Sequence, residues 1–226
     1  MQQNIRNMCT AIIFDFLNQL SQNNNREWFN EHKVLYLHAK KEVEGIIRAV
    51  GQKIVEIDPA LQGFTEPSQV LFRIYKDVRF SKDKRPYKTH FGCFFATGGK
   101  SAESGGYYLH LEPKNSFVSG GVWCPQPAVL KKIRQEIFYN TDDFLRILNA
   151  SDFKNYFPKL DEEDLLQRIP TGFSSDFEHG NLLKYKHYTV SSPLKEDVIL
   201  SNELIFHIVK MFGLLKPFVS FLNVKD

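Results

Sequence analysis

Residues 71–90 have the sequence LFRIYKDVRFSKDKRPYKTH, and the rest of the chain is arranged around this stretch. It contains seven cations and two acids, so its local net charge is +5, whereas the whole chain carries only +3. The positive charge is therefore gathered here, and the remainder is slightly acidic. Aromatic residues and a proline are interleaved with the charges, which a flexible basic tail would not need. The pattern predicts a strand that runs into a rigid turn and presents cations to an anionic partner.

Strand-like patterns begin in this stretch and continue beyond it. Apolar and polar residues alternate over 69–80, which predicts the first strand. Three further strands are expected at 89–97, 106–113 and 116–123, and short connections make a largely antiparallel sheet the natural arrangement. Residues 184–190 alternate enough to predict an additional strand.

Helical patterns flank the strands on both sides. Apolar residues at helical spacing predict a helix over 11–20 and a long one that starts from an Asn24 cap, with Glu27 completing a capping box, and ends at Asp58-Pro59. After the strands, helices are expected at 127–138, 141–149, 151–157, 161–169 and 201–212, with a last short segment starting at Pro217. Helices, then strands, then helices indicate an α+β fold, and we expect one domain over residues 1–226.

Composition places the chain among ordinary soluble proteins. Of 226 residues, 42% are hydrophobic and 24% charged, with 20 phenylalanines available for an aromatic core. The three cysteines are far apart and show no CxxC spacing, so a reducing cytoplasm is expected, with Cys93 and Cys124 as inert buried thiols. We expect neither a signal peptide nor a membrane span, because the first residues lack a leader pattern and no apolar run approaches about 18 residues.

The cations of 71–90 form the first candidate site. Arg79, Lys84 and Lys88, with Arg73, are predicted to bind a small ligand that carries phosphate or carboxylate. A purely structural role competes evenly with this interpretation, because Asp77 and Asp83 can neutralise the neighbouring cations. Ser81 and Asp83 are expected to satisfy backbone donors in the turn, and Pro86 to stiffen its exit.

Tyr108, His110 and Glu112 form the second candidate site. Their spacing places a hydroxyl, an imidazole and a carboxylate in a row on one face of a strand. His110 and Glu112 are the candidate catalytic pair for proton transfer, and His90 is a candidate to join them from the neighbouring strand. A solvated strand face is the commoner explanation of such a row. A His-x-Glu pair alone indicates a metal only weakly, so no metal site is predicted.

Other signals are sparse. Trp123 is a candidate aromatic wall for the ligand, although a core tryptophan is the commoner outcome. The chain has no P-loop, no dinucleotide-binding glycine pattern and no nucleophile elbow. The sequence therefore identifies no cofactor and leaves open whether the protein is an enzyme.

Several of these motifs occur together in one known family. The chain resembles the uncharacterised bacterial and fungal family called domain of unknown function 2461. The resemblance rests on segments in the expected order, which are FLNQLSQNNNREWF at 16–29, RIYKDVRFSKDKRPYK at 73–88, YYLHLEP at 107–113, GGVWCP at 120–125 and PTGF at 170–173. It spans nearly the whole chain and implies one full-length domain. It implies no activity, substrate, cofactor or catalytic residue.

Three functions are compatible with these patterns. The first is an enzyme or binding protein for a small anionic ligand, with the cations as anchors. The second is a nucleic-acid-binding module that uses Tyr75, Tyr87 or Phe80 for stacking, which the modest net charge disfavours. The third is an interaction protein in which the charge cluster only fixes a turn. The sequence favours them in this order and leaves the oligomeric state open.

Overall fold

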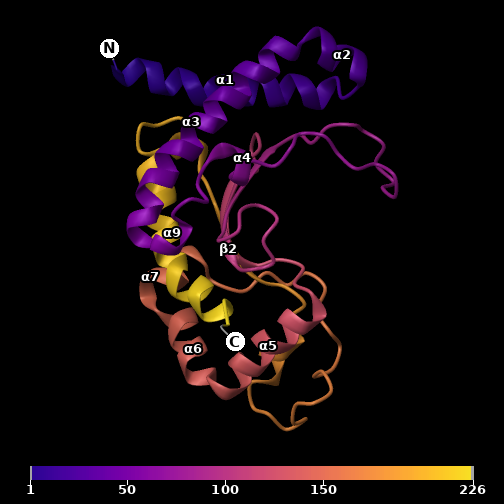
Figure 1. Cartoon of the computed structure of the whole chain (residues 1–226), viewed down its shortest axis with the longest axis vertical. Helices are drawn as coiled ribbons and strands as arrows, with labels where there is room; N and C mark the ends of the chain where they lie inside the picture. The colour runs from indigo at the N-terminus through magenta and orange to yellow at the C-terminus, as the bar shows by residue number, and fades with distance from the viewer. Residues whose placement is uncertain (1, 225–226) are drawn as a thin grey trace.

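The N-terminal third of the protein is helical (Figure 1). The computed structural model describes residues 2–224, beginning with the helices α1 (Gln2–Gln22), α2 (Arg26–Glu31) and α3 (Lys33–Ile57). Helices α1 and α3 pack against each other through buried apolar side chains such as Leu17 and Val43. Asn25, one residue after the predicted cap, caps α2 by accepting a hydrogen bond from the Trp28 backbone N–H at 2.9 Å.

Asn24 has another role. Its side-chain amide donates to the Tyr87 carbonyl at 3.0 Å and accepts from the Tyr87 N–H at 3.1 Å. These two bonds join the turn after α1 to the end of the cationic stretch. The prediction that Asn24 caps the long helix is therefore wrong, since its side chain is committed to another segment.

Four antiparallel strands follow, in the spatial order β1-β2-β3-β4. They are β1 (Phe91–Phe95), β2 (Gly106–Leu111), β3 (Phe117–Val122) and β4 (Tyr188–Pro193). The register pairs His110 with Gly92 on β1 and with Phe117 on β3. The α+β fold with an antiparallel sheet is confirmed, and the strand expected at 184–190 is β4, displaced by a few residues.

The predicted strand at 69–80 does not form. Pro67–Val70 is the short helix α4, which follows the 3-10 turn η1 (Pro59–Leu61), and the stretch after it makes only two isolated bridges, Leu71 to Cys93 and Tyr75 to Tyr87. Tyr75 and Tyr87 pack on Phe29 of α2, with ring centroids 5.9 Å and 4.0 Å away. Apolar and polar residues do alternate over 69–80. Because Tyr75 and Tyr87 pack on α2 rather than within the sheet, the chain between them leaves the sheet as a projecting ribbon (Figure 1).

The C-terminal part is mostly helical. It comprises α5 (Pro127–Tyr139), α6 (Thr141–Asn149), α7 (Ser151–Tyr156), the 3-10 turn η2 (Gly180–Lys184), α8 (Glu196–Ile199) and α9 (Leu204–Leu222). Pro127 begins α5 as predicted. No helix forms at 161–169, where the Asp161 N–H instead bonds to the Thr189 carbonyl and the Leu166 N–H to the Lys184 carbonyl.

Helix α9 runs through Pro217, where the sequence predicted a new segment to begin. Leu215 and Phe218, on either side of the proline, are fully buried, and this burial holds both halves of the helix in one line. Within the part of the chain that the structure describes, α9 is the helix whose length and composition would suffice to cross a membrane. In this fold eight of its residues are buried against the sheet and neighbouring helices.

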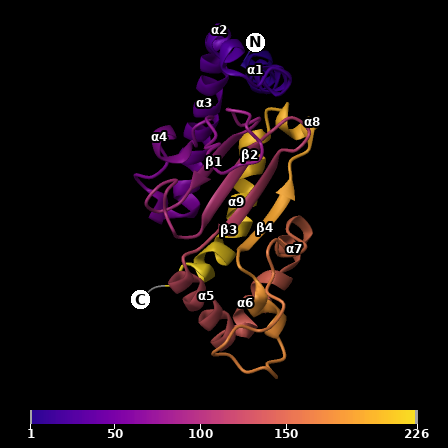
Figure 2. The ribbon, with the colours of Figure 1, turned by 90° about the vertical axis from the view of Figure 1, so that its right-hand side faces the viewer.

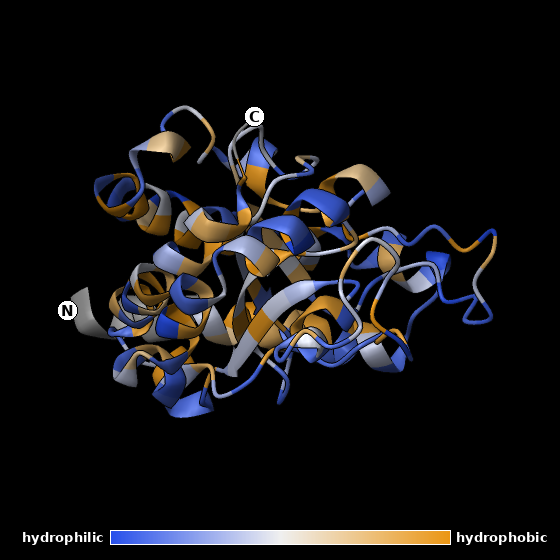
Figure 3. Cartoon of the chain, turned by 90° about the horizontal axis from the view of Figure 1, so that it is seen from below, coloured by the Kyte–Doolittle hydropathy of each residue, from blue (hydrophilic) through white to orange (hydrophobic). Residues whose placement is uncertain are grey.

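The core lies between the sheet and the helix layer of α3 and α9. Figure 2 shows α9 crossing behind the four strands, and Figure 3 shows the apolar parts of the helices gathered toward the interior. Alternate strand residues such as Phe95, Leu109 and Val118 are fully buried on this side. The intervening residues, including Tyr108 and His110, therefore lie on the opposite face of the sheet, away from α9.

Candidate functional site on the outer face of the sheet

A chain of hydrogen bonds runs along the outer face of β2. The Tyr108 hydroxyl and His110 Nδ1 share a hydrogen bond of 3.1 Å, and His110 Nε2 lies 3.2 Å from Glu112 Oε2. Thr89 Oγ1 donates to Glu112 Oε1 at 2.8 Å, and the Asn115 amide donates to Glu112 Oε2 at 3.0 Å. Every polar group of the row thus has a partner, and the carboxylate is held from three sides.

His90 joins this row, as the sequence suggested. The register that pairs Phe91 with Leu111 places His90 across from Glu112, and its ring centroid lies 4.2 Å from that of His110. On its other side the His110 ring stacks on Phe117 at 4.6 Å. The imidazole of His110 is thereby held between two rings, with only 10% of its side chain exposed.

Gly92 makes room for the row. A Cβ at this position would lie 2.6 Å from the Tyr108 hydroxyl, so a larger residue opposite His110 would displace the tyrosine. Gly92 was not among the site residues predicted from the sequence. The signal was present, since a glycine inside a strand indicates a close approach by a neighbouring group.

Burial shapes the proton equilibria of the cluster. Burial, assisted by the charges of His110, Lys88 and Lys76, lowers the pKa of His90 to about 4. Burial also lowers the pKa of His110, against the opposing effect of Glu112. Both imidazoles are therefore neutral near pH 7 and keep a lone pair available for a proton or a metal.

The neighbouring acid and phenol shift in opposite directions. Burial opposes ionisation of Glu112, but its hydrogen bonds to Asn115, Thr89 and His110 prevail and lower its pKa. Burial raises the pKa of the Tyr108 hydroxyl, with a smaller contribution from the Glu112 charge. The row thus combines an ionised carboxylate, a neutral imidazole and a protonated phenol.

One of the four predicted cations, Lys88, acts on this cluster, and Arg73 lies near Lys88. Lys88 is half-buried, its Nζ lies 5.4 Å from the centroid of the Phe72 ring, and its pKa is lowered by burial and by the charge of Arg73. Neither Lys88 nor Arg73 forms an ion pair within residues 10–224. Arg73 also lines a groove of about 540 Å³, whose lining carries both cations, such as Arg48 and Lys100, and acids, Glu44 and Glu66.

The other two predicted cations lie on the projecting ribbon. Arg79 is 76% exposed in its side chain and is neutralised by Asp77, with Nη2 and Oδ2 2.7 Å apart. Lys84 donates to the Val78 carbonyl at 3.1 Å. These bonds stay within the ribbon, so Arg79 and Lys84 do not converge with Lys88 on one pocket. This arrangement of Arg79 and Lys84 is the one expected if their charges only fix the turn, which was the alternative to anion binding.

The ribbon is held by its own side chains. Ser81 Oγ accepts from the Asp83 N–H, and Asp83 Oδ1 accepts from the Arg85 N–H, each at 3.1 Å, as the sequence predicted. Asp83 also pairs with Lys76 at 2.7 Å and with Arg85 at 2.8 Å. The contacts with Arg85 and Lys76 keep the pKa of Asp83 far below its usual range.

Trp123 lies at the far end of β3, separate from the cluster. Its ring is 56% exposed and stacks on His187 at 4.3 Å. Cys124 beside it is exposed, so the expectation of a buried thiol is wrong there, because a positive φ of 49° turns the chain at the strand end. Cys93 is buried as expected, and burial raises the pKa of its thiol.

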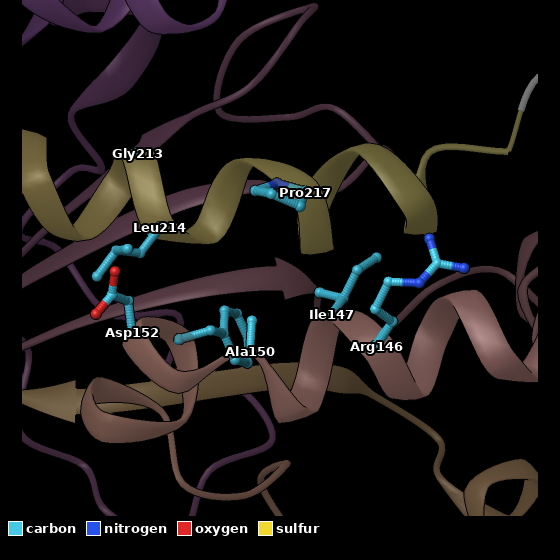
Figure 4. Close-up of a pocket in the computed structure, with 8 residues that line it drawn as sticks. Arg146, Ile147, Ala150, Asp152, Gly213, Leu214 and Pro217 are labelled. Carbon is cyan, nitrogen blue, oxygen red and sulfur yellow. The ribbon is translucent and has the colours of Figure 1, made fainter.

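A separate hollow of about 320 Å³ lies between α6, α7 and α9 (Figure 4). Ile147, Ala150, Leu214 and Pro217 give it a mostly apolar lining. It lies on the helix side of the sheet, whereas the His110 cluster lies on the other side. It contributes no residue to either predicted site.

Comparisons with known proteins place the chain in a family without an assigned activity. The search of curated proteins and the search of solved structures each found no match. The sequence model of the family described as conserved hypothetical protein (DUF2461) matches residues 12–221. The resemblance noted in the motifs is thereby confirmed over nearly the full length. The chain belongs to the DUF2461 family of conserved hypothetical proteins.

Proposed function

We propose that the protein binds a small phosphate- or carboxylate-bearing ligand on the outer face of the sheet. Arg73 and Lys88 hold the anionic group, and the rest of the ligand lies toward His90 and His110. Arg79 and Lys84, predicted as ligand residues from the sequence, have no part in this version, because their bonds stay within the ribbon.

One observation carries the proposal. Arg73 and Lys88 lie close enough for the Arg73 charge to lower the pKa of Lys88, and no acid among residues 10–224 neutralises either cation through an ion pair. Two adjacent cations, one of them half-buried, repel each other and lose hydration, so an anion between them is stabilised by both. Lys88 also acts on His90, which connects the anion position to the cluster.

Within that cluster, His110 and Glu112 are the candidate groups for proton transfer. An ionised carboxylate next to a neutral imidazole is a common arrangement for a general base. Tyr108 would orient the ring through Nδ1. Trp123 lies apart from these residues, at the far end of β3, and has no part in this version.

Titration calorimetry with inorganic phosphate, pyrophosphate and succinate, in buffer containing EDTA, tests the proposal. Replacing Lys88 by Met keeps the apolar stem against Phe72 and removes the charge, and we expect affinity to fall about 10-fold or more. Arg79→Ala is the matched control and should leave affinity unchanged. Equal loss in both variants, or absence of binding to the wild type, would contradict the proposal.

A nucleic-acid ligand is the second candidate, because of one exposed ring. Phe80 is 95% exposed at the ribbon, with the Arg79 guanidinium 5.8 Å from its centroid. Exposed aromatic residues among cations stack on bases, at about 1–3 kcal/mol per base. Tyr75 and Tyr87, the other predicted stacking residues, pack against α2. Fluorescence anisotropy with a single-stranded oligonucleotide at two salt concentrations, for wild type and Phe80→Ala, decides this alternative.

A further inference from the structure

Three metal-ligating side chains converge at the end of the hydrogen-bonded row. One nitrogen each of His90 and His110 and one oxygen of Glu112 lie within 4.8 Å of one another. The sequence predicted no metal here because His-x-Glu is a weak signal by itself. The sheet register adds the missing ligand, since it brings His90 across from Glu112 on the adjacent strand.

The closest pair already has the spacing of two ligands on one ion. His110 Nε2 and Glu112 Oε2 are 3.2 Å apart. Two ligands at about 2.0–2.2 Å from a zinc-sized ion lie roughly 3.0–3.5 Å apart at octahedral to tetrahedral angles. The ligand atom of His90 lies within 4.8 Å of the other two and has to approach them, and its ring is half-buried rather than fixed in the core.

The surrounding bonds match the support that metal ligands receive. A metal-bound histidine donates its other ring N–H to a nearby acceptor, and the Tyr108 oxygen at 3.1 Å from Nδ1 is placed to accept it. Thr89 and Asn115 fix the Glu112 carboxylate in the same way. Such partners orient a carboxylate toward an ion without using its remaining lone pairs.

His90 itself lacks any other function in the fold. Between residues 10 and 224 its ring nitrogens form no hydrogen bond, and its ring contacts His110. Two imidazoles side by side with a carboxylate beside them form a donor set that can bind one cation together. An ordinary solvated strand face would not require this convergence.

We propose that His90, His110 and Glu112 bind one divalent first-row transition-metal ion of the zinc class. Two imidazoles and a carboxylate suit such ions, whereas Mg²⁺ and Ca²⁺ prefer oxygen ligands alone. Three protein ligands leave at least one coordination position for water or a ligand. The metal site stands independently of the anion proposal, although an anion held by Lys88 would lie next to the open position.

The test uses the full chain after EDTA treatment and removal of the chelator, in a phosphate-free buffer. Calorimetry with Zn²⁺ should show about one ion per chain, and Co²⁺ should give the visible absorption bands of a site with fewer than six ligands. His90→Ala and Glu112→Gln should each weaken Zn²⁺ binding more than about 100-fold, and Tyr108→Phe about 10-fold. Mn²⁺, Fe²⁺ and Mg²⁺ titrations define the preferred ion.

The matched control is His38→Ala, which removes an exposed imidazole from α3. It should bind Zn²⁺ like the wild type, and far-UV circular dichroism of all metal-free variants checks that they fold. Absence of Zn²⁺ binding to the wild type, or equal binding by the His90 and His38 variants, would overturn the metal site. Phosphate binding is measured separately, in EDTA. A negative result for the metal site therefore does not affect the test of anion binding, and the reverse also holds.

Discussion

Asp58 is a largely buried polar residue that connects the helices to the sheet. It accepts hydrogen bonds from the Tyr107 hydroxyl at 2.8 Å and from Lys216 Nζ at 2.7 Å, so it joins the end of α3 to β2 and α9. Tyr107 is fully buried and Asp58 nearly so. Replacing the carboxylate by an amide would remove its charge and one of its two acceptor oxygens, so the buried Tyr107 hydroxyl and the Lys216 ammonium group could no longer both be satisfied.

We therefore expect Asp58→Asn to lower the free energy of unfolding by about 2–3 kcal/mol, measured by urea denaturation. Glu162→Gln, which breaks an exposed pair with Lys159, is the control and should cost less than about 0.5 kcal/mol. Similar effects in the two variants would show that the buried contacts do not stabilise the core.

The same carboxylate makes stability depend on pH. Burial alone would raise the pKa of Asp58, but the bonds from Lys216 and Tyr107 prevail and lower it. Its contribution is complete above the unfolded-state pKa of about 4 and is lost as the pH falls through the lower folded-state pKa. The gap in melting temperature between wild type and Asp58→Asn should thus shrink below about pH 4. A constant gap down to pH 2 would contradict this.

At the scale of elements, the pairing of β3 with β4 depends on a glycine. Gly121 has a φ of 125°, and a Cβ there would lie 2.0 Å from the Tyr188 carbonyl oxygen on β4. No rotation of a flexible side chain relieves a clash with backbone.

Gly121→Ala should therefore destabilise the protein by about 3 kcal/mol or more in urea unfolding. Gly45→Ala is the matched substitution, since Gly45 is exposed in α3 and has open space around its Cβ position. It should stabilise the helix by about 0.5–1 kcal/mol. If both changes were neutral, the strand pairing drawn here would be incorrect.

The elements also show what sequence patterns can and cannot predict. Alternation and helical spacing are local, and they located all four strands of the sheet, β4 with a shift of a few residues, and most helices. The stretch 69–80 alternates too, yet Tyr75 packs on α2, and that choice depends on a helix 44 or more residues away. Likewise the burial of Leu215 and Phe218, which keeps α9 continuous at Pro217, is a tertiary effect.

The candidate site was predictable to a similar extent. The period of two placed Tyr108, His110 and Glu112 on one face, and His90 was expected beside them. The register that sets His90 opposite Glu112 depends on strand pairing, which the sequence does not specify. The separation of Lys88 from Arg79 could not be predicted either, because it follows from the ribbon leaving the sheet.

At the scale of the whole molecule, the ribbon is the segment that projects from the body (Figure 1). Its ion pairs and turn bonds lie within residues 76–85, and Phe80 at 95% exposure contributes nothing to the core. We expect limited trypsin digestion, followed by mass spectrometry, to cut first after Arg79, Lys82 or Lys84 within residues 10–224, since Pro86 prevents cleavage after Arg85. A first cut in the helices of that range would show that the ribbon is covered.

We infer that the functional surface lies at His90, His110 and Glu112 on the outer sheet face, and not at the cations of the ribbon. Anomalous diffraction at the zinc edge, from crystals grown with Zn²⁺ in a phosphate-free medium, is the decisive test. We predict a single strong peak within bonding distance of the two imidazoles and the carboxylate. Zinc found only elsewhere, with His90 and Glu112 left as they are without the ion, would contradict the account.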